Sequence, residues 1–118
     1  MGVQVRVPED RHRGAVERVR SATLEGPGHT DPELRRSLAA HAGQVWSSGN
    51  SDVEVPNYLA PYVQKVALAS YKVTDEDIDD LRESAGLSED EILEITLAAA
   101  FGCALAALET GTGLAGTD

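Results

Sequence analysis

VTDEDIDDLRESAGLSEDEILEITLAAAFGCALAAL, residues 73–108, carries the clearest structural signals in the chain. Two helix starts follow one another in it. Thr74 can cap the first helix, and Gly86 can end it because glycine tolerates the left-handed conformation common at helix C-termini. Ser88 and Glu91, three residues apart, form the pattern of a capping box at the start of the second. The stretch therefore predicts a helical hairpin.

The second arm of this hairpin is predicted from Glu89 to about Glu109, on the order of 30 Å at 1.5 Å per residue. It is apolar nearly all round from Ile92 to Leu108, which is typical of a helix buried on most of its sides. Many of its residues are alanine or glycine, so neighbouring helices can approach closely. A small domain has few ways to cover such a helix completely. We therefore expect a homo-oligomer.

The rest of the chain predicts three further helices, over residues 8–24, 32–46 and 57–72. Val3, Val5 and Val7 precede the first as an extended lead-in. The second starts at a proline with Thr30 or Asp31 as its cap. The third has its apolar residues at helical spacing. The sequence thus predicts one all-α domain of about five helices: N-terminal helices over 1–50, a helical core over 51–110, and a flexible glycine-rich tail over 111–118.

The chain is acidic, with a formal charge of −10 over 118 residues. This charge argues against nucleic-acid binding, since affinity for the phosphate backbone comes largely from basic surface. Seven of the ten basic residues lie in the first 36, whereas residues 74–94 hold ten of the twenty acids. The basic N-terminal segment either lies against the acidic hairpin of another subunit or is a plain solvated surface; the second interpretation is preferred.

Cys103 is the single cysteine, so no intrachain disulfide can form, which fits a reducing compartment. The N-terminus has no signal-peptide pattern. The longest uninterrupted apolar run, residues 97–108, is too short to cross a bilayer. We expect a cytoplasmic protein with no membrane partner.

Residues 58–108 resemble the alkylhydroperoxidase/carboxymuconolactone decarboxylase-like superfamily, through the phrase AGLSEDEILEITLAAAFGCALAAL and the helix ahead of it. The resemblance implies an all-helical fold of this type that assembles as a trimer or hexamer. Many members carry a Cys-x-x-Cys-x-x-x-His motif for thiol-dependent peroxide reduction. The positions that match it here are Tyr71, Thr74 and Ile78, which can neither form a redox disulfide nor shuttle protons. The chain is similar to a cysteine-free branch of the superfamily.

Two residues are weak candidates for catalysis. Cys103 is a soft nucleophile, but it lies mid-helix among apolar residues with no nearby cation to lower its pKa, so a buried structural thiol is the preferred interpretation. Glu94 lies where the apolar face begins. It is either a desolvated carboxylate with a raised pKa, as catalytic acids often are, or a solvent-exposed side chain beside Glu91, which is preferred.

The aromatic residues suggest a binding pocket. Tyr58, Tyr62 and Tyr71, together with Trp46, could line a cavity between helices, and Thr74 lies next to it by the family resemblance. Packing in the core or at a subunit interface is the simpler interpretation. The histidines are too scattered for a metal motif on one helix, and the acids are explained by helix capping, so we expect neither a metal nor a cofactor.

Three functions follow from these observations. The preferred one is a non-catalytic, oligomer-forming helical protein that serves as a binding or scaffold module, with a small molecule or a protein as partner. The second is an enzyme of the superfamily that acts without thiols on a small organic acid. The third is a peroxidase using Cys103 alone. A pocket with a tyrosine hydroxyl or buried carboxylate at the junction of the third helix and the hairpin would favour the second.

Overall fold

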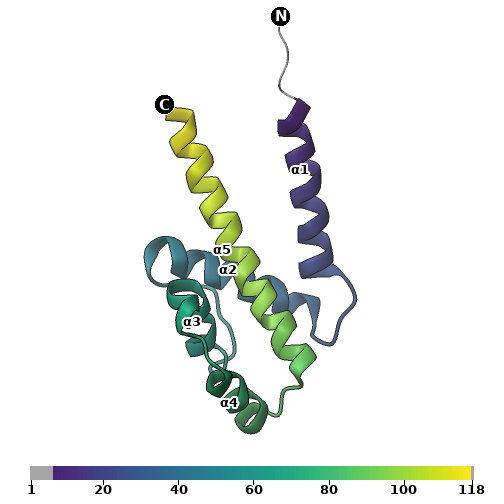
Figure 1. Cartoon of the computed structure of the whole chain (residues 1–118), viewed down its shortest axis with the longest axis vertical. Helices are drawn as coiled ribbons and strands as arrows, with labels where there is room; N and C mark the ends of the chain where they lie inside the picture. Colours follow the sequence, from purple (N-terminus) through teal and green to yellow (C-terminus); the bar gives the residue numbers. More distant parts are fainter. Residues whose placement is uncertain (1–6, 118) are drawn as a thin grey trace, which may run out of the picture.

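The computed structural model describes residues 7–117, and the side chains of residues 14–110. Over this range the fold is all-α, with five α-helices and no strand. In chain order (Figure 1) they are α1 (Val7–Arg20), α2 (Pro32–Ser48), α3 (Ala60–Ala69), α4 (Asp75–Ala85) and α5 (Glu89–Thr117). A π-helical turn, η1 (Ser21–Glu25), continues α1, and a 3-10 turn, η2 (Ser70–Lys72), continues α3.

Both helix starts of the hairpin are confirmed. The Thr74 hydroxyl accepts a hydrogen bond from the Asp77 amide, and the Asp77 carboxylate accepts one from the Thr74 amide at 2.9 Å. The Ser88 amide donates to Glu91 at 2.8 Å, and the Glu91 amide donates to the Ser88 hydroxyl at 3.1 Å. Gly86 ends α4 with φ at 70°, in the left-handed region that favours glycine. Local sequence alone sets these features.

The other helices begin and end near their predicted positions, with some differences. Asp31, and not Thr30, caps α2 by accepting from the Glu33 amide at 2.9 Å. The helix then extends just past Trp46 to Ser48. The first and third predicted helices both occur, but each changes from an α-helix to a turn of different pitch before it ends. The lead-in at Val3 and Val5 lies outside the described residues.

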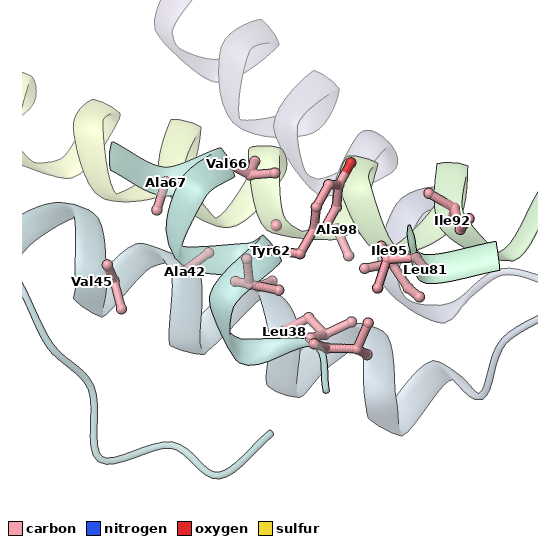
Figure 2. Close-up of a cluster of buried hydrophobic side chains, with 14 of the residues drawn as sticks. Leu38, Ala42, Val45, Tyr62, Val66, Ala67, Leu81, Ile92, Ile95 and Ala98 are labelled. Carbon is pink, nitrogen blue, oxygen red and sulfur yellow. The ribbon is translucent and has the colours of Figure 1, made fainter. Parts of the chain in front are cut away.

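The core forms where α5 crosses α2, with α3 packed beside the crossing (Figure 2). Its largest fully buried side chains are Leu38, Leu59, Val63 and Ile95. Small residues bring α2 and α5 together: a Cβ atom at Gly102 would overlap the backbone carbonyl of Ala39. The predicted use of small residues for close helix contact is therefore seen at this crossing.

Beyond this crossing, α5 continues past its predicted end near Glu109 to Thr117. Residues 110–117, TGTGLAGT, contain three glycines and three threonines, which have low helix propensity, so local sequence does not explain this extension. The flexibility predicted for residues 111–118 stays a prediction. In Figure 1 the last turns of α5 and most of α1 project from the same end of the molecule, away from α4. Two long helices thus extend beyond the packed core.

Candidate functional site

An open groove of about 750 Å³ lies between α4 and α5. Its apolar floor contains Val73, Ile78, Ile92 and Leu93. Its rim carries Asp75 and Asp79 from α4, and Glu89 and Asp90 from α5. We call this feature the acidic groove. It combines an apolar surface with carboxylates on both walls.

A pair of hydroxyl groups lies at the inner end of the acidic groove. The Thr96 hydroxyl donates to the Ile92 carbonyl at 2.7 Å, so the Tyr62 hydroxyl, 2.7 Å from Thr96 Oγ1, is the donor of that pair. The Tyr62 oxygen can still accept a hydrogen bond. The pair can therefore receive a donor group, but neither residue shows a neighbouring base that would activate it.

The rim of the acidic groove is only partly neutralised. Arg82 bridges the walls, with Nη1 at 3.9 Å from Asp79 and 3.4 Å from Glu89. Both pairs are solvent-exposed, and exposed ion pairs of this kind contribute little to stability. The four carboxylates of the rim face the Arg82 guanidinium and, at Asp90, the His29 ring at 3.7 Å, so acidic groups outnumber basic ones and the groove attracts cations.

The predicted aromatic pocket is only partly assembled. Tyr58 and Tyr62 share a second cavity of about 250 Å³ beside the acidic groove. Tyr71 lines neither cavity: its side chain is 83% exposed, with the Lys72 ammonium 5.9 Å from its ring centre. Trp46 lies on α2, away from both, and Thr74 acts as the cap of α4. The four aromatic side chains do not converge.

Lys65 and Asp77 close one side of the smaller cavity. The Lys65 ammonium lies 3.0 Å from both carboxylate oxygens of Asp77. The backbone hydrogen bond from Thr74, and then the one from Lys65, lower the pKa of Asp77 below its usual value. Asp77 therefore stays ionised and joins the start of α4 to α3.

Glu94 neither has a raised pKa nor extends into solvent. Its side chain is only 19% exposed, and its carboxylate accepts four hydrogen bonds. The His29 amide donates to Glu94 Oε2 at 2.7 Å, and the His29 ring Nδ1 lies 3.1 Å from the same oxygen. Thr30 donates to Glu94 Oε1 from its amide at 2.8 Å and from its hydroxyl at 2.6 Å. Burial raises the pKa of Glu94, but these hydrogen bonds outweigh it and hold the pKa at about 2. The raised-pKa hypothesis is therefore wrong.

Glu94 acts instead as a structural clamp, together with a residue that sequence reasoning missed. The buried Arg35 guanidinium on α2 donates to the carbonyls of Thr23 and Gly26. Arg35 and Glu94 thus hold the connection between α1 and α2 from two helices. The partners are distant in sequence, up to 65 residues for Glu94, so no local pattern could reveal them.

Cys103 has the features of a structural thiol. It is half-buried, with Sγ 3.6 Å from the Ala42 carbonyl, and burial raises its pKa. A raised pKa leaves little thiolate at neutral pH, whereas a reactive cysteine needs the thiolate. Among the described residues, no three histidine, cysteine, aspartate or glutamate side chains gather to hold a metal ion.

The outer side of α5 presents a run of exposed apolar residues, which we call the apolar seam: Leu97, Ala100, Ala104 and Leu108. Their spacing of three or four residues places them on one face of the helix. The stretch Glu89–Thr110 is long and apolar enough to cross a membrane by length and composition alone, and 28% of its most apolar window is buried within the described chain. The ionised Glu94 within it would be costly in a bilayer. The absence of a membrane partner stays a prediction.

Comparison with known proteins gives no relative: no family model, no curated protein and no solved structure matches the chain.

Proposed function

We propose that the chain is a non-catalytic, oligomer-forming helical protein that serves as a binding or scaffold module in the cytoplasm. In keeping with its sequence resemblance, we assign it to the cysteine-free branch of the alkylhydroperoxidase/carboxymuconolactone decarboxylase-like superfamily. The observation that carries the proposal is the apolar seam of α5. A helix this apolar is normally covered on most sides.

A second copy of the same chain is the occupant that fits the seam best. The seam is uncharged and repeats every three or four residues, so two antiparallel or parallel copies can interdigitate along it. Its small central residues, Ala100 and Ala104, permit a close approach, and Leu97 and Leu108 provide apolar area at either end. The exposed side chain of Leu97 alone would contribute about 1.5 kcal/mol on burial.

The candidate catalytic groups support a non-catalytic role. Cys103 has a raised pKa, and the oxygens of Glu94 are used in the clamp. Tyr71 is directed into solvent, and Thr74 is a helix cap. Each candidate thus has a structural role or lacks an activating partner.

The oligomer is tested by measuring solution mass with light scattering. We expect the wild-type chain to have a multiple of its 12.5 kDa mass and Leu97→Glu to be a monomer. Leu68→Glu is the matched control, because Leu68 on α3 is 50% exposed, against 51% for Leu97, and lies outside the seam. A monomeric wild type, equal effects of the two substitutions, or a chain that floats with lipid vesicles would overturn the proposal.

A thiol-independent enzyme is the second candidate, because the Tyr62–Thr96 hydroxyl pair opens onto the acidic groove at the junction of α3 and the hairpin. The carboxylates of the rim disfavour an organic acid as substrate, so this candidate ranks below the first. Amide chemical shifts of the hairpin recorded with a panel of small carboxylic acids test it. Binding that is lost in Tyr62→Phe would favour the enzyme.

A further inference from the structure

We infer that α1 of a second copy docks in the acidic groove. The acidic groove adjoins the apolar seam, since Leu93 lies one helical turn before Leu97, but the inference is argued from α1 and the groove alone and does not depend on pairing through the seam. Its basis is that α1 and the acidic groove carry opposite charge, that each has an uncovered apolar surface, and that they lie toward opposite ends of the molecule (Figure 1).

The helix α1 is poorly packed on its own chain. Its main contacts are with the π-helical turn η1 that follows it, and Figure 1 shows it standing apart from the core. Val19 is 49% exposed and Val16 is only half-buried. An amphipathic helix with its apolar side uncovered is a ready docking element.

The sequence of α1 is basic over residues 11–20, RHRGAVERVR, which contain four arginines and one glutamate. At 100° per residue, Ala15, Val16 and Val19 share one face of the helix, and position 12, a histidine, falls on the same face one turn earlier. Positions 11 and 18 flank this face on one side, and positions 13 and 20 on the other. The helix thus has an apolar stripe between two basic edges.

The acidic groove has the matching arrangement. Its floor is apolar, with Ile78, Ile92 and Leu93, and carboxylates stand on both walls. Arg20 is already near Glu17 and Glu25, at 3.7 and 3.6 Å, but these exposed pairs are weak enough to be exchanged. If the valines of α1 lie on the floor of the acidic groove, one basic edge of the helix runs along each wall of the groove.

The base of α1 is fixed in a way that requires the docking to occur between chains. The Arg35 guanidinium donates hydrogen bonds to the carbonyls of Thr23 and Gly26, just after α1, and Leu24 between them is buried in the core. From this fixed base α1 leads away from α4 (Figure 1), along a molecule whose longest extent is 60 Å. The arm cannot turn back into its own groove while these contacts hold, so a second copy supplies the groove.

Disulfide trapping between two differently tagged full-length chains tests the inference. Both carry Cys103→Ser, and both carry Leu97→Glu, so that pairing through the apolar seam cannot contribute. One chain has Val19→Cys, and the other has Leu93→Cys in the groove floor. The control partner has Leu68→Cys, which is similarly exposed but outside the groove.

We expect the Val19–Leu93 pair to cross-link about tenfold faster than the Val19–Leu68 pair at low ionic strength, and the advantage to vanish in molar salt. Asp79→Lys with Asp90→Lys in the groove chain should abolish it, and adding Arg13→Glu with Arg18→Glu to the arm chain should restore it. Circular dichroism checks that the variants keep their helical content. Equal rates for the two pairs, no effect of the charge reversals, or an arm that binds anionic vesicles without cross-linking would overturn the inference.

Discussion

Glu94→Ala removes the clamp between α5 and the connection that precedes α2, and its cost can be derived from the contacts. The wild-type carboxylate accepts four hydrogen bonds, of which the two from Thr30 are partly buried and the two from His29 are exposed. Hydrogen bonds to a charged group contribute about 1.5–3 kcal/mol each when buried, and water replaces part of that when they are exposed. Because the bonds share one carboxylate, we expect the free energy of unfolding to fall by about 3 kcal/mol in total.

For a domain of this size, that loss corresponds to a fall in Tm of about 10 °C. Glu94→Gln should lose about half as much, because its oxygen can still accept from one residue while its amide NH₂ faces a donor from the other. Chemical unfolding followed by circular dichroism measures both. Glu83→Gln is the matched control, since among the described residues the Glu83 carboxylate has no hydrogen-bond or ion-pair partner. An unfolding free energy for Glu94→Ala within about 0.5 kcal/mol of wild type would refute the clamp.

The same comparison should depend on pH in a defined direction. The pKa of Glu94 is about 2 in the folded chain, below its ordinary value of 4.5. A lowered folded pKa means that the clamp contributes fully above pH 4.5 and that its contribution is lost as pH falls toward 2. The difference in unfolding free energy between wild type and Glu94→Ala should therefore be constant near neutrality and shrink below pH 4.5. A gap that grows on acidification would contradict the assignment.

Two further predictions concern α5. Gly102→Ala should destabilise the fold by about 1–3 kcal/mol because the added Cβ overlaps the Ala39 carbonyl. Gly14→Ala is its control on α1: the added Cβ has ordinary clearance there and should stabilise the helix by about 0.5–1 kcal/mol. Thermal unfolding compares the two variants, and equal effects would contradict the close crossing of α2 and α5. Native Cys103 should react with an alkylating reagent much more slowly than in the unfolded chain, and only at a pH above the ordinary thiol pKa, because burial raises its pKa. Fast labelling at neutral pH would revive thiol chemistry.

Features set by neighbouring residues could be predicted from the sequence, and features set by distant residues could not. The capping box at Ser88 and the cap at Thr74 depend on residues three positions away, and both predictions are confirmed; the reciprocal bond from Asp77 that makes Thr74 a capping box as well was not predicted. Tyr71 was considered for an aromatic pocket with Tyr58, Tyr62 and Trp46, or for packing in the core or an interface. It lies in the 3-10 turn that follows α3 and is exposed to solvent, a position that depends on how the chain leaves α3 and not on a local pattern.

The hydrogen-bond partners of Glu94 are likewise set by residues distant in sequence. The sequence correctly marks Glu94 as unusual, because it is an acid at the edge of an apolar helix. It contains no signal that the amides of His29 and Thr30 will meet the carboxylate, and so both interpretations of Glu94, the preferred solvent-exposed side chain and the raised pKa, are wrong. The acidic groove was likewise hidden, since its rim residues were explained by helix capping alone.

The contacts of α5 also restrict how that helix can move. Glu94 fixes it to the connection before α2, and Gly102 fixes it against Ala39, about 12 Å further along the helix. Two attachment points at this separation prevent α5 both from sliding along its axis and from rolling about it. A single chain therefore cannot rotate Leu97 and Leu108 inward to hide them from water. The apolar seam keeps one fixed orientation in every copy, so a partner meets a surface that needs no rearrangement before contact.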